Sequence, residues 1–478
     1  MSSASGLDTG AAHSGPEPAA AGLSWFGIFR LGLVQTALGA IVVLTTSTIN
    51  RVMVVELALP AMLPGVLVAL HYALQVLRPR WGHGSDLSGR RTPWIFGGMV
   101  VLATGGWLAA YATATLATHH VPGLILAVLA FVLIGLGVGA SGTSLLALLA
   151  RHVAPRRRPA AATVVWVMMI MGFVLTAGTA GHFLDPYTPE RLVQVSAAVS
   201  LIALALSAVA LLGVEPSRDP ATSRARLEQE QPGGQPGAGN GFMRALREVW
   251  SEPGSRRFAL FVFVSMLAYS AQDLILEPFA GAVFGLTPGQ STQLAGVQHA
   301  GVLLGMVAVA LLGTWRGSGT TAAGMRGWII GGCLLSALML AALAAASLQG
   351  PGWPLQATVF ALGVANGVFA VAAIGSMMTL ADQGAASREG LRMGLWGAAQ
   401  ALAFGLGGFL GTAVSDGAHL LFGDPVAAYA CVFAAEAALF VLAAAMALRI
   451  GEPGTARAAA HTGFANHPAH HATEGNCA

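Results

Sequence analysis

Two histidines lie inside long apolar stretches, where their side chains could bind a metal ion. His71 falls within "LPGVLVALHYALQVL" and His299 within "STQLAGVQHAGVLLGMVAVALLG". The neutral imidazole ring is a common ligand for metal ions. A histidine inside a membrane can equally form a hydrogen bond to a neighbouring helix. The sequence leaves both roles open, and we treat His71 and His299 as candidate metal ligands.

A set of polar residues lies at the ends of two other apolar stretches. These stretches, "INRVMVVEL" and "AQDLILEPF", contain Asn50, Arg51, Glu56, Gln272, Asp273 and Glu277. Because a cation lies in one stretch and acids lie in the other, we expect Arg51 to pair with Asp273 or Glu277. Such a pair would tie two halves of the chain together at the outer face of a membrane. The alternative is that these residues are exposed at helix ends and unpaired, where an ion pair contributes little.

A third motif lies in the loop between two apolar stretches. It has the spacing Gly-x3-Asp-x2-Gly-Arg-Arg and is formed by Gly82, Asp86, Gly89, Arg90 and Arg91. The glycines permit a tight turn, and the aspartate can accept from backbone N–H groups at a helix start. The spacing resembles the cytoplasmic loop between the second and third spans of the major facilitator superfamily. The alternative is an ordinary basic loop that contains glycines.

The composition is that of an all-α integral membrane protein. Hydrophobic residues make up 55% of the 478 residues and charged residues 9%, whereas soluble domains carry about 25% charged residues. A transmembrane helix needs about 20 mostly apolar residues. Twelve stretches meet this requirement, at 31–50, 57–77, 94–115, 124–149, 161–182, 192–213, 258–277, 292–313, 328–348, 355–380, 391–413 and 425–448.

The arginines predict the orientation of these spans. All 24 basic residues are arginine, and all except Arg51 and Arg191 fall on one side of the membrane. Positively charged loops stay in the cytoplasm, so both termini are expected there. The predicted parts are a disordered tail (1–24), a six-helix bundle (25–213), a cytoplasmic linker (214–257), a second six-helix bundle (258–450) and a disordered, histidine-containing tail (451–478). Within the linker, "FMRALREVW" is amphipathic and predicts a helix on the membrane surface.

The two bundles look like repeats of one six-helix unit. Gly135-x3-Gly139 in the fourth span matches Gly363-x3-Gly367 in the tenth, and such glycine pairs let helices approach closely. The fourth and tenth spans carry no charge, so the space they are expected to line suits an apolar or amphipathic cargo. We find no nucleotide-binding loop, catalytic triad or metal cluster, and we therefore expect no enzyme activity.

Two stretches carry a more specific resemblance. The segment from Arg30 to Met99, with "RPRWGHGSDLSGRRTPW" near its end, and the segment "QDLILEPFAGAVFGLTPGQSTQL" resemble the PucC/LhaA family of the major facilitator superfamily, the bacteriochlorophyll delivery proteins of purple phototrophs. The first stretch is more similar to the LhaA branch, which serves the core antenna, than to the PucC branch, which serves the peripheral antenna. The resemblance covers all twelve spans.

The resemblance implies a role in assembling light-harvesting complexes. A member of this family would lie in the bacterial inner or intracytoplasmic photosynthetic membrane, bind bacteriochlorophyll and pass it to the light-harvesting α and β polypeptides. Its partners would also include the reaction centre, the bacteriochlorophyll synthase, the membrane insertion machinery and the lipid bilayer, but no nucleic acid. Because the magnesium of such a pigment takes one axial ligand, His71 and His299 become candidate pigment ligands.

Two other functions stay open. One is a major facilitator transporter that exports a tetrapyrrole or another amphipathic molecule, driven by protons through Asp273 or Glu277. The other is a scaffold that shields antenna helices and holds no pigment.

Overall fold

The computed structural model describes residues 23–78, 81, 90–154, 157–215, 247, 250–315, 322–382 and 389–449, and within these the chain is almost entirely helical. The first half contains α1 (Trp25–Val43), which continues through η1 (Leu44–Thr48), α2 (Ile49–Arg51) and η2 (Val52–Glu56), then α3 (Met62–Leu74) with η3 (Gln75–Leu77), α5 (Thr92–Leu116), α6 (His120–His152), α7 (Arg158–Leu184) and α8 (Pro189–Leu211). The second half contains α11 (Pro253–Phe284), α12 (Pro288–Trp315), α13 (Ala322–Gln349), α14 (Leu355–Asp382), α15 (Glu389–Phe422) and α16 (Pro425–Ala447).

These helices confirm the twelve predicted spans, with one difference in length. Eleven of the described helices are long and apolar enough to cross a membrane, while the α-helical part of the second span, Met62–Leu74, has only 13 residues. That span was expected to begin at residue 57. Residues 58–60 are instead irregular, with Ala58 at a positive φ of 50°. Pro60 disfavours helical backbone at the residue before it, so α3 begins only after this proline.

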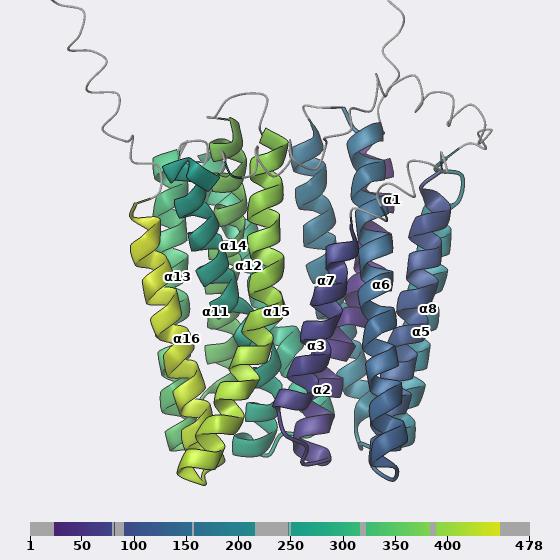
Figure 1. Ribbon diagram of the computed structural model, residues 1–478, viewed down its shortest axis with the longest axis vertical. Helices are drawn as coiled ribbons and strands as arrows, with labels where there is room; N and C mark the ends of the chain where they lie inside the picture. The colour runs from purple at the N-terminus through teal and green to yellow at the C-terminus, as the bar shows by residue number, and fades with distance from the viewer. Residues whose placement is uncertain are drawn as a thin grey trace, which may run out of the picture.

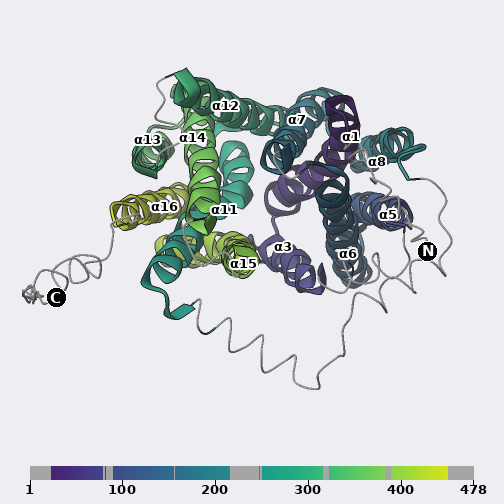
Figure 2. The same cartoon turned by 90° about the horizontal axis from the view of Figure 1, so that it is seen from above.

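The twelve spans form two six-helix bundles that stand side by side (Figures 1 and 2). Each bundle has its own apolar core, one among the helices α1–α8 and the other among α11–α16. The bundles meet along two seams, where α3 packs against α15 and α7 packs against α12. A small apolar cluster of Ile170, Val302 and Met306 lies across the second seam. We call the face that carries residues 57–61, 185–188 and 285–287 the outer face, as the arginine distribution predicts.

Glycines set the close packing of equivalent helices in the two bundles. A side chain on Gly135 of α6 would meet the backbone oxygen of His71 in α3 at 2.8 Å, and one on Gly363 of α14 would meet that of Gln298 in α12 at 2.1 Å. The fourth span thus packs on the second in the same way as the tenth packs on the eighth. This shared contact supports the repeat that was inferred from the glycine spacing.

The close contact at Gly363 gives a direct prediction about stability. Gly363→Ala places a methyl group against the Gln298 carbonyl, and overpacking of this kind costs about 1–3 kcal/mol. Gly331 in α13 is the matched control, because nothing lies within 4 Å of its missing side chain. We expect Gly363→Ala to lower the melting temperature in detergent while Gly331→Ala leaves it unchanged or raises it. Equal melting temperatures for the two variants would contradict the packing described here.

Candidate functional site

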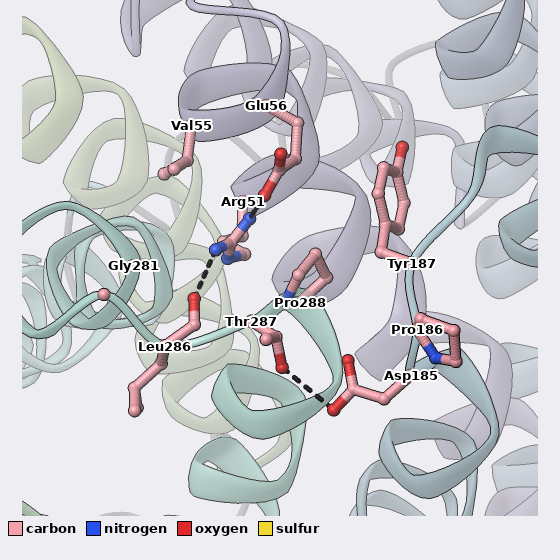
Figure 3. A pocket seen from close by; sticks show the side chains of 11 residues that line it. Arg51, Val55, Glu56, Asp185, Pro186, Tyr187, Gly281, Leu286, Thr287 and Pro288 are labelled. Atoms are coloured by element: carbon pink, nitrogen blue, oxygen red, sulfur yellow. Dashed lines mark hydrogen bonds and ion pairs between the residues drawn. The ribbon is translucent and has the colours of Figure 1, made fainter.

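The buried arginine of the first span is held by its own helix and by the opposite bundle. Arg51 is only 2% exposed, and its Nη1 donates to Glu56 Oε1 at 2.5 Å (Figure 3). Its Nη2 donates to the backbone oxygen of Leu286, which follows the end of α11, also at 2.5 Å. The expected ion pair with Asp273 or Glu277 was therefore wrong. The alternative of an exposed, unpaired arginine is wrong as well.

Neighbouring polar residues of the first span also bond to the second bundle. The Asn50 side chain donates to the backbone oxygen of Leu274 at 2.7 Å, and Thr48 shares a hydrogen bond of 2.9 Å with Thr292. Glu277 is buried beside this contact and accepts from the Ser291 hydroxyl at 3.4 Å. The predicted cluster therefore does join the two halves, through backbone carbonyls and hydroxyls.

Two aspartates close the outer face at the two seams. Asp416 of α15 accepts from the backbone N–H groups of Ala61 and Met62 at 3.0 and 2.7 Å, so a carboxylate of one bundle caps a helix of the other. Asp185, at the equivalent end of α7, accepts from the Thr287 hydroxyl at 2.9 Å, directly before α12 begins (Figure 3). A negative charge is favourable at a helix N-terminus. The sequence analysis identified neither aspartate.

An open cavity of about 810 Å³ lies between these contacts on the outer face. Its walls come from both bundles, and Arg51, Glu56, Asp185, Tyr187 and Thr287 contribute polar groups (Figure 3). Burial and the neighbouring Glu56 carboxylate raise the pKa of Tyr187 to about 12, so its hydroxyl stays protonated at neutral pH. The cavity is thus the water-accessible side of the contact between the bundles.

The cross-bundle contacts of Asp185 and Asp416 predict how the outer face can be opened. Loss of a helix cap or of one hydrogen bond costs about 1 kcal/mol, which corresponds to about fivefold in an equilibrium between closed and open forms. We expect the double variant Asp185→Ala with Asp416→Ala to lengthen the distance between spin labels at positions 190 and 349, measured by double electron–electron resonance after Cys333, Cys431 and Cys477 are replaced.

Asp424→Ala is the control for this experiment. Asp424 caps α16 within its own bundle, where it accepts from the Val426 N–H at 3.0 Å. The control should lower stability without changing the label distance. If it lengthens that distance as much as the double variant does, the caps have no special part in closing the outer face.

On the opposite face, Arg91 of the predicted motif and Glu215 make contacts between helices, and the sequence analysis did not predict the contact of Glu215. Gly82, Asp86 and Gly89 lie outside the described residues. Arg91, which is described, donates from its side chain to the backbone oxygen of Ala147 in α6.

Glu215, just after α8, accepts from the backbone N–H groups of Arg91 and Thr92 and from the Thr92 hydroxyl, each at 2.8 Å. It therefore caps α5 from the end of the sixth span. Its position at the end of an apolar stretch was the only signal in the sequence.

Removal of the Glu215 carboxylate leaves three donors without their acceptor. Loss of a helix cap costs about 1 kcal/mol, and these donors are part-buried, so Glu215→Ala should lower the melting temperature in detergent. Glu190→Ala is the control, because Glu190 is exposed in the first turn of α8. Equal melting temperatures for the two variants would show that the Glu215 cap does not hold α5.

The lone pair of His71 is used by a hydrogen bond to its own helix, and its other ring nitrogen carries the proton. Arg78 donates to Gln75 Oε1, which turns the Gln75 amide nitrogen toward His71 Nε2 at 3.2 Å. An amide nitrogen can only donate, so His71 Nε2 uses its lone pair and Nδ1 carries the proton. Nδ1 is buried and has no partner in the described part of the chain. In this arrangement His71 offers no free lone pair to a metal.

His299 has the opposite arrangement. Its Nδ1 lies 2.8 Å from the backbone oxygen of Ala295, and because a carbonyl only accepts, Nδ1 must carry the proton. Among the described residues nothing donates to the Nε2 lone pair, which is the pattern that is usual for metal-binding histidines. His299 lies at the seam between α7 and α12, where Phe173 meets its ring edge-on at a centroid distance of 4.8 Å. It is partly exposed, whereas His71 is buried. The geometry therefore favours His299 over His71 as a ligand.

The fold defines the class of protein, which is a twelve-helix membrane protein of the major facilitator type. The structure resembles a solved D-xylose-proton symporter with a TM-score of 0.66 and 16% identity, covering 89% of this chain and 97% of the other. It also resembles a solved peptide transporter POT in complex with sulfate, with a TM-score of 0.61 and 15% identity over 90% and 96% of the two chains. At these identities the likeness concerns the fold alone.

Sequence comparison places the chain within that class. The family model described as PUCC protein matches residues 48–454, and the chain belongs to this family. It is 53% identical to the Rhodobacter capsulatus protein named bacteriochlorophyll synthase 44.5 kDa chain, over 89% of this chain and 95% of the relative. It is 33% identical to Protein PucC of Rhodobacter capsulatus, over 89% and 92%. The lower identity to PucC agrees with the expectation that the chain is closer to another branch of the family.

Proposed function

We propose that this protein binds bacteriochlorophyll and delivers it to light-harvesting α and β polypeptides, in the assembly of the core antenna. The observation that carries the proposal is the free Nε2 lone pair of His299 at the seam between the two bundles. The family membership supports it, as does the name of the 53% identical relative. The role requires binding and release of a pigment and no catalysis.

The free ring nitrogen of His299 is chemically suited to bind the magnesium ion of the pigment. The magnesium ion of bacteriochlorophyll accepts one axial ligand, and a neutral imidazole supplies it. The Ala295 carbonyl fixes the tautomer and raises the basicity of the ring. Phe173 and the apolar cluster of Ile170, Val302 and Met306 provide an apolar surface in the same seam. These residues would orient the ring and keep water away from the metal.

The closed outer face indicates a path for the pigment. Hydrogen bonds made by Thr48, Asn50 and Arg51, and those that Asp416 accepts, join the bundles on that side. A pigment held at His299 would therefore enter and leave through the bilayer or from the cytoplasmic side. Delivery at that side would place the protein next to the bacteriochlorophyll synthase, the membrane insertion machinery and the reaction centre, in the photosynthetic membrane.

A transporter is the second candidate function, and two carboxyl groups inside the spans favour it. Glu436 in α16 is 2% exposed, and Asp273 in α11 is half-buried. Ionisable residues inside membranes often serve proton relays. If the protein exports a tetrapyrrole with protons, replacement of Asp273 and Glu436 by their amides should abolish transport. If it delivers pigment, antenna assembly should survive those changes better than it survives the loss of His299.

The pigment ligand can be tested with the purified full chain. The protein would be prepared in mild detergent from phototrophic membranes that lack antenna complexes, and its near-infrared absorption recorded. We expect a co-purifying bacteriochlorophyll band that is lost in His299→Phe and retained in His71→Phe, because only His299 offers a lone pair.

His182→Phe is a further control, since His182 is exposed at the end of α7. If the pigment band persists in His299→Phe, another residue is the axial ligand of the pigment. Absence of pigment from the unaltered protein would contradict the proposed function.

A further inference from the structure

An aromatic cluster lies at the other seam, between α3 and α15. Phe404 of α15 lies between two tyrosines, with its ring centroid 5.6 Å from that of Tyr72 in α3 and 5.9 Å from that of Tyr269 in α11. All three rings are half-buried, although each belongs to a helix that crosses the membrane. Tyr72 comes from one bundle and Tyr269 from the other. The cluster therefore exists only where the two bundles meet.

A carboxyl group adjoins the two tyrosines. Asp273 follows Tyr269 by one turn of α11, and it interacts electrostatically with Tyr72 and with Tyr269. In the described part of the chain, neither the Asp273 carboxyl nor either hydroxyl has a hydrogen bond or an ion pair. Polar groups within the hydrocarbon region are costly unless they are satisfied. The polar atoms of these three residues are accessible at the seam, so water or a bound molecule can reach them.

A second contact extends the cluster along the same two helices. Gln400 lies one turn before Phe404 on α15, and its Nε2 is 4.0 Å from the sulfur of Met266, about one turn before Tyr269 on α11. Gln400, Phe404 and Asp273 are all half-buried. Along about two helical turns, α11 and α15 thus present apolar side chains and hydrogen-bonding groups next to one another. Such a surface suits a flat, apolar molecule with a few polar substituents at its edge.

We propose that Tyr72, Tyr269, Phe404 and Asp273 form a binding site for the carbonyl-bearing edge of a planar tetrapyrrole. The inference rests on the proposed function, because it assigns the pigment class as the ligand of this second seam. Aromatic rings pack well against a planar macrocycle. The tyrosine hydroxyls donate to the keto and ester carbonyls at its edge, and Asp273 adds a third donor when its carboxyl is protonated. The site would select pigments that carry such carbonyls from those that lack them.

The test uses conservative variants of the purified full chain with bacteriochlorophyll a as the probe. Tyr72→Phe and Tyr269→Phe keep the ring and remove only the hydroxyl. The matched control is Tyr111→Phe, because Tyr111 is 46% exposed on α5, outside the seam. Two quantities are measured, namely the dissociation constant from the absorption change and the carbonyl stretching frequency of the bound pigment from resonance Raman spectra.

We expect each seam variant to weaken pigment binding about fivefold, which is the effect of one lost hydrogen bond. We also expect it to raise the stretching frequency of one pigment carbonyl, since that carbonyl loses its donor. Phe404→Leu should weaken binding by a similar factor without changing the carbonyl frequencies. Tyr111→Phe should change neither quantity. The frequency change separates a hydrogen bond to the pigment from a general loss of stability.

The outcomes separate this inference from the proposed function. Pigment that binds through His299, with seam variants indistinguishable from Tyr111→Phe in affinity and in carbonyl frequency, would overturn the seam site and leave the function standing. An unaltered protein that binds no bacteriochlorophyll would overturn both. Gel filtration and thermal melting of every variant confirm that the fold is retained, and the phenylalanine variants keep the ring contacts with Phe404.

Discussion

Within the membrane, every buried polar group needs a partner, and this requirement determines how the two bundles meet. Arg51 forms an ion pair with Glu56 of its own helix and donates a hydrogen bond to the Leu286 carbonyl of the opposite bundle. Asn50 likewise donates a hydrogen bond to the Leu274 carbonyl of the opposite bundle. These contacts depend on backbone groups, so they fix where the second bundle lies without needing a charged partner from it. The bundles are joined below the open outer cavity for this reason, and any ligand site deeper between them must be reached from elsewhere.

Hydrophobicity and arginine placement were sufficient to predict the twelve spans, but the partner of Arg51 could not be predicted from α-helical periodicity. Five residues of an α-helix correspond to a rotation of about 140°, so Glu56 would face away from Arg51. The residues between them form a π-helical segment, whose hydrogen bonds join residues five apart. That segment turns Glu56 toward the arginine. The cross-bundle contacts of Asp185 with Thr287 and of Asp416 with Ala61 could likewise not be predicted, because they join residues far apart in the sequence.

The two candidate histidines occupy equivalent spans, yet they differ in the residue that follows one helical turn later. Gln75 follows His71 by four positions and occupies its Nε2, while Leu303 follows His299 at the same spacing and has no hydrogen-bonding group. The sequence contained this difference. Only the structure showed that Arg78 fixes the orientation of Gln75. Asp273 was expected to pair with Arg51, and instead it lies with Tyr72 and Tyr269 at the opposite seam from His299.

The central claim is that His299 coordinates the magnesium of a bound pigment, and solid-state NMR tests it most directly. Protein labelled with ¹⁵N only at histidine would be compared with and without bacteriochlorophyll. The account predicts that one Nε2 resonance shifts on pigment binding, that its Nδ1 stays protonated, and that this signal is missing from His299→Phe. If no Nε2 resonance shifts while pigment is bound, or if the shifted signal persists in His299→Phe, coordination by His299 is contradicted.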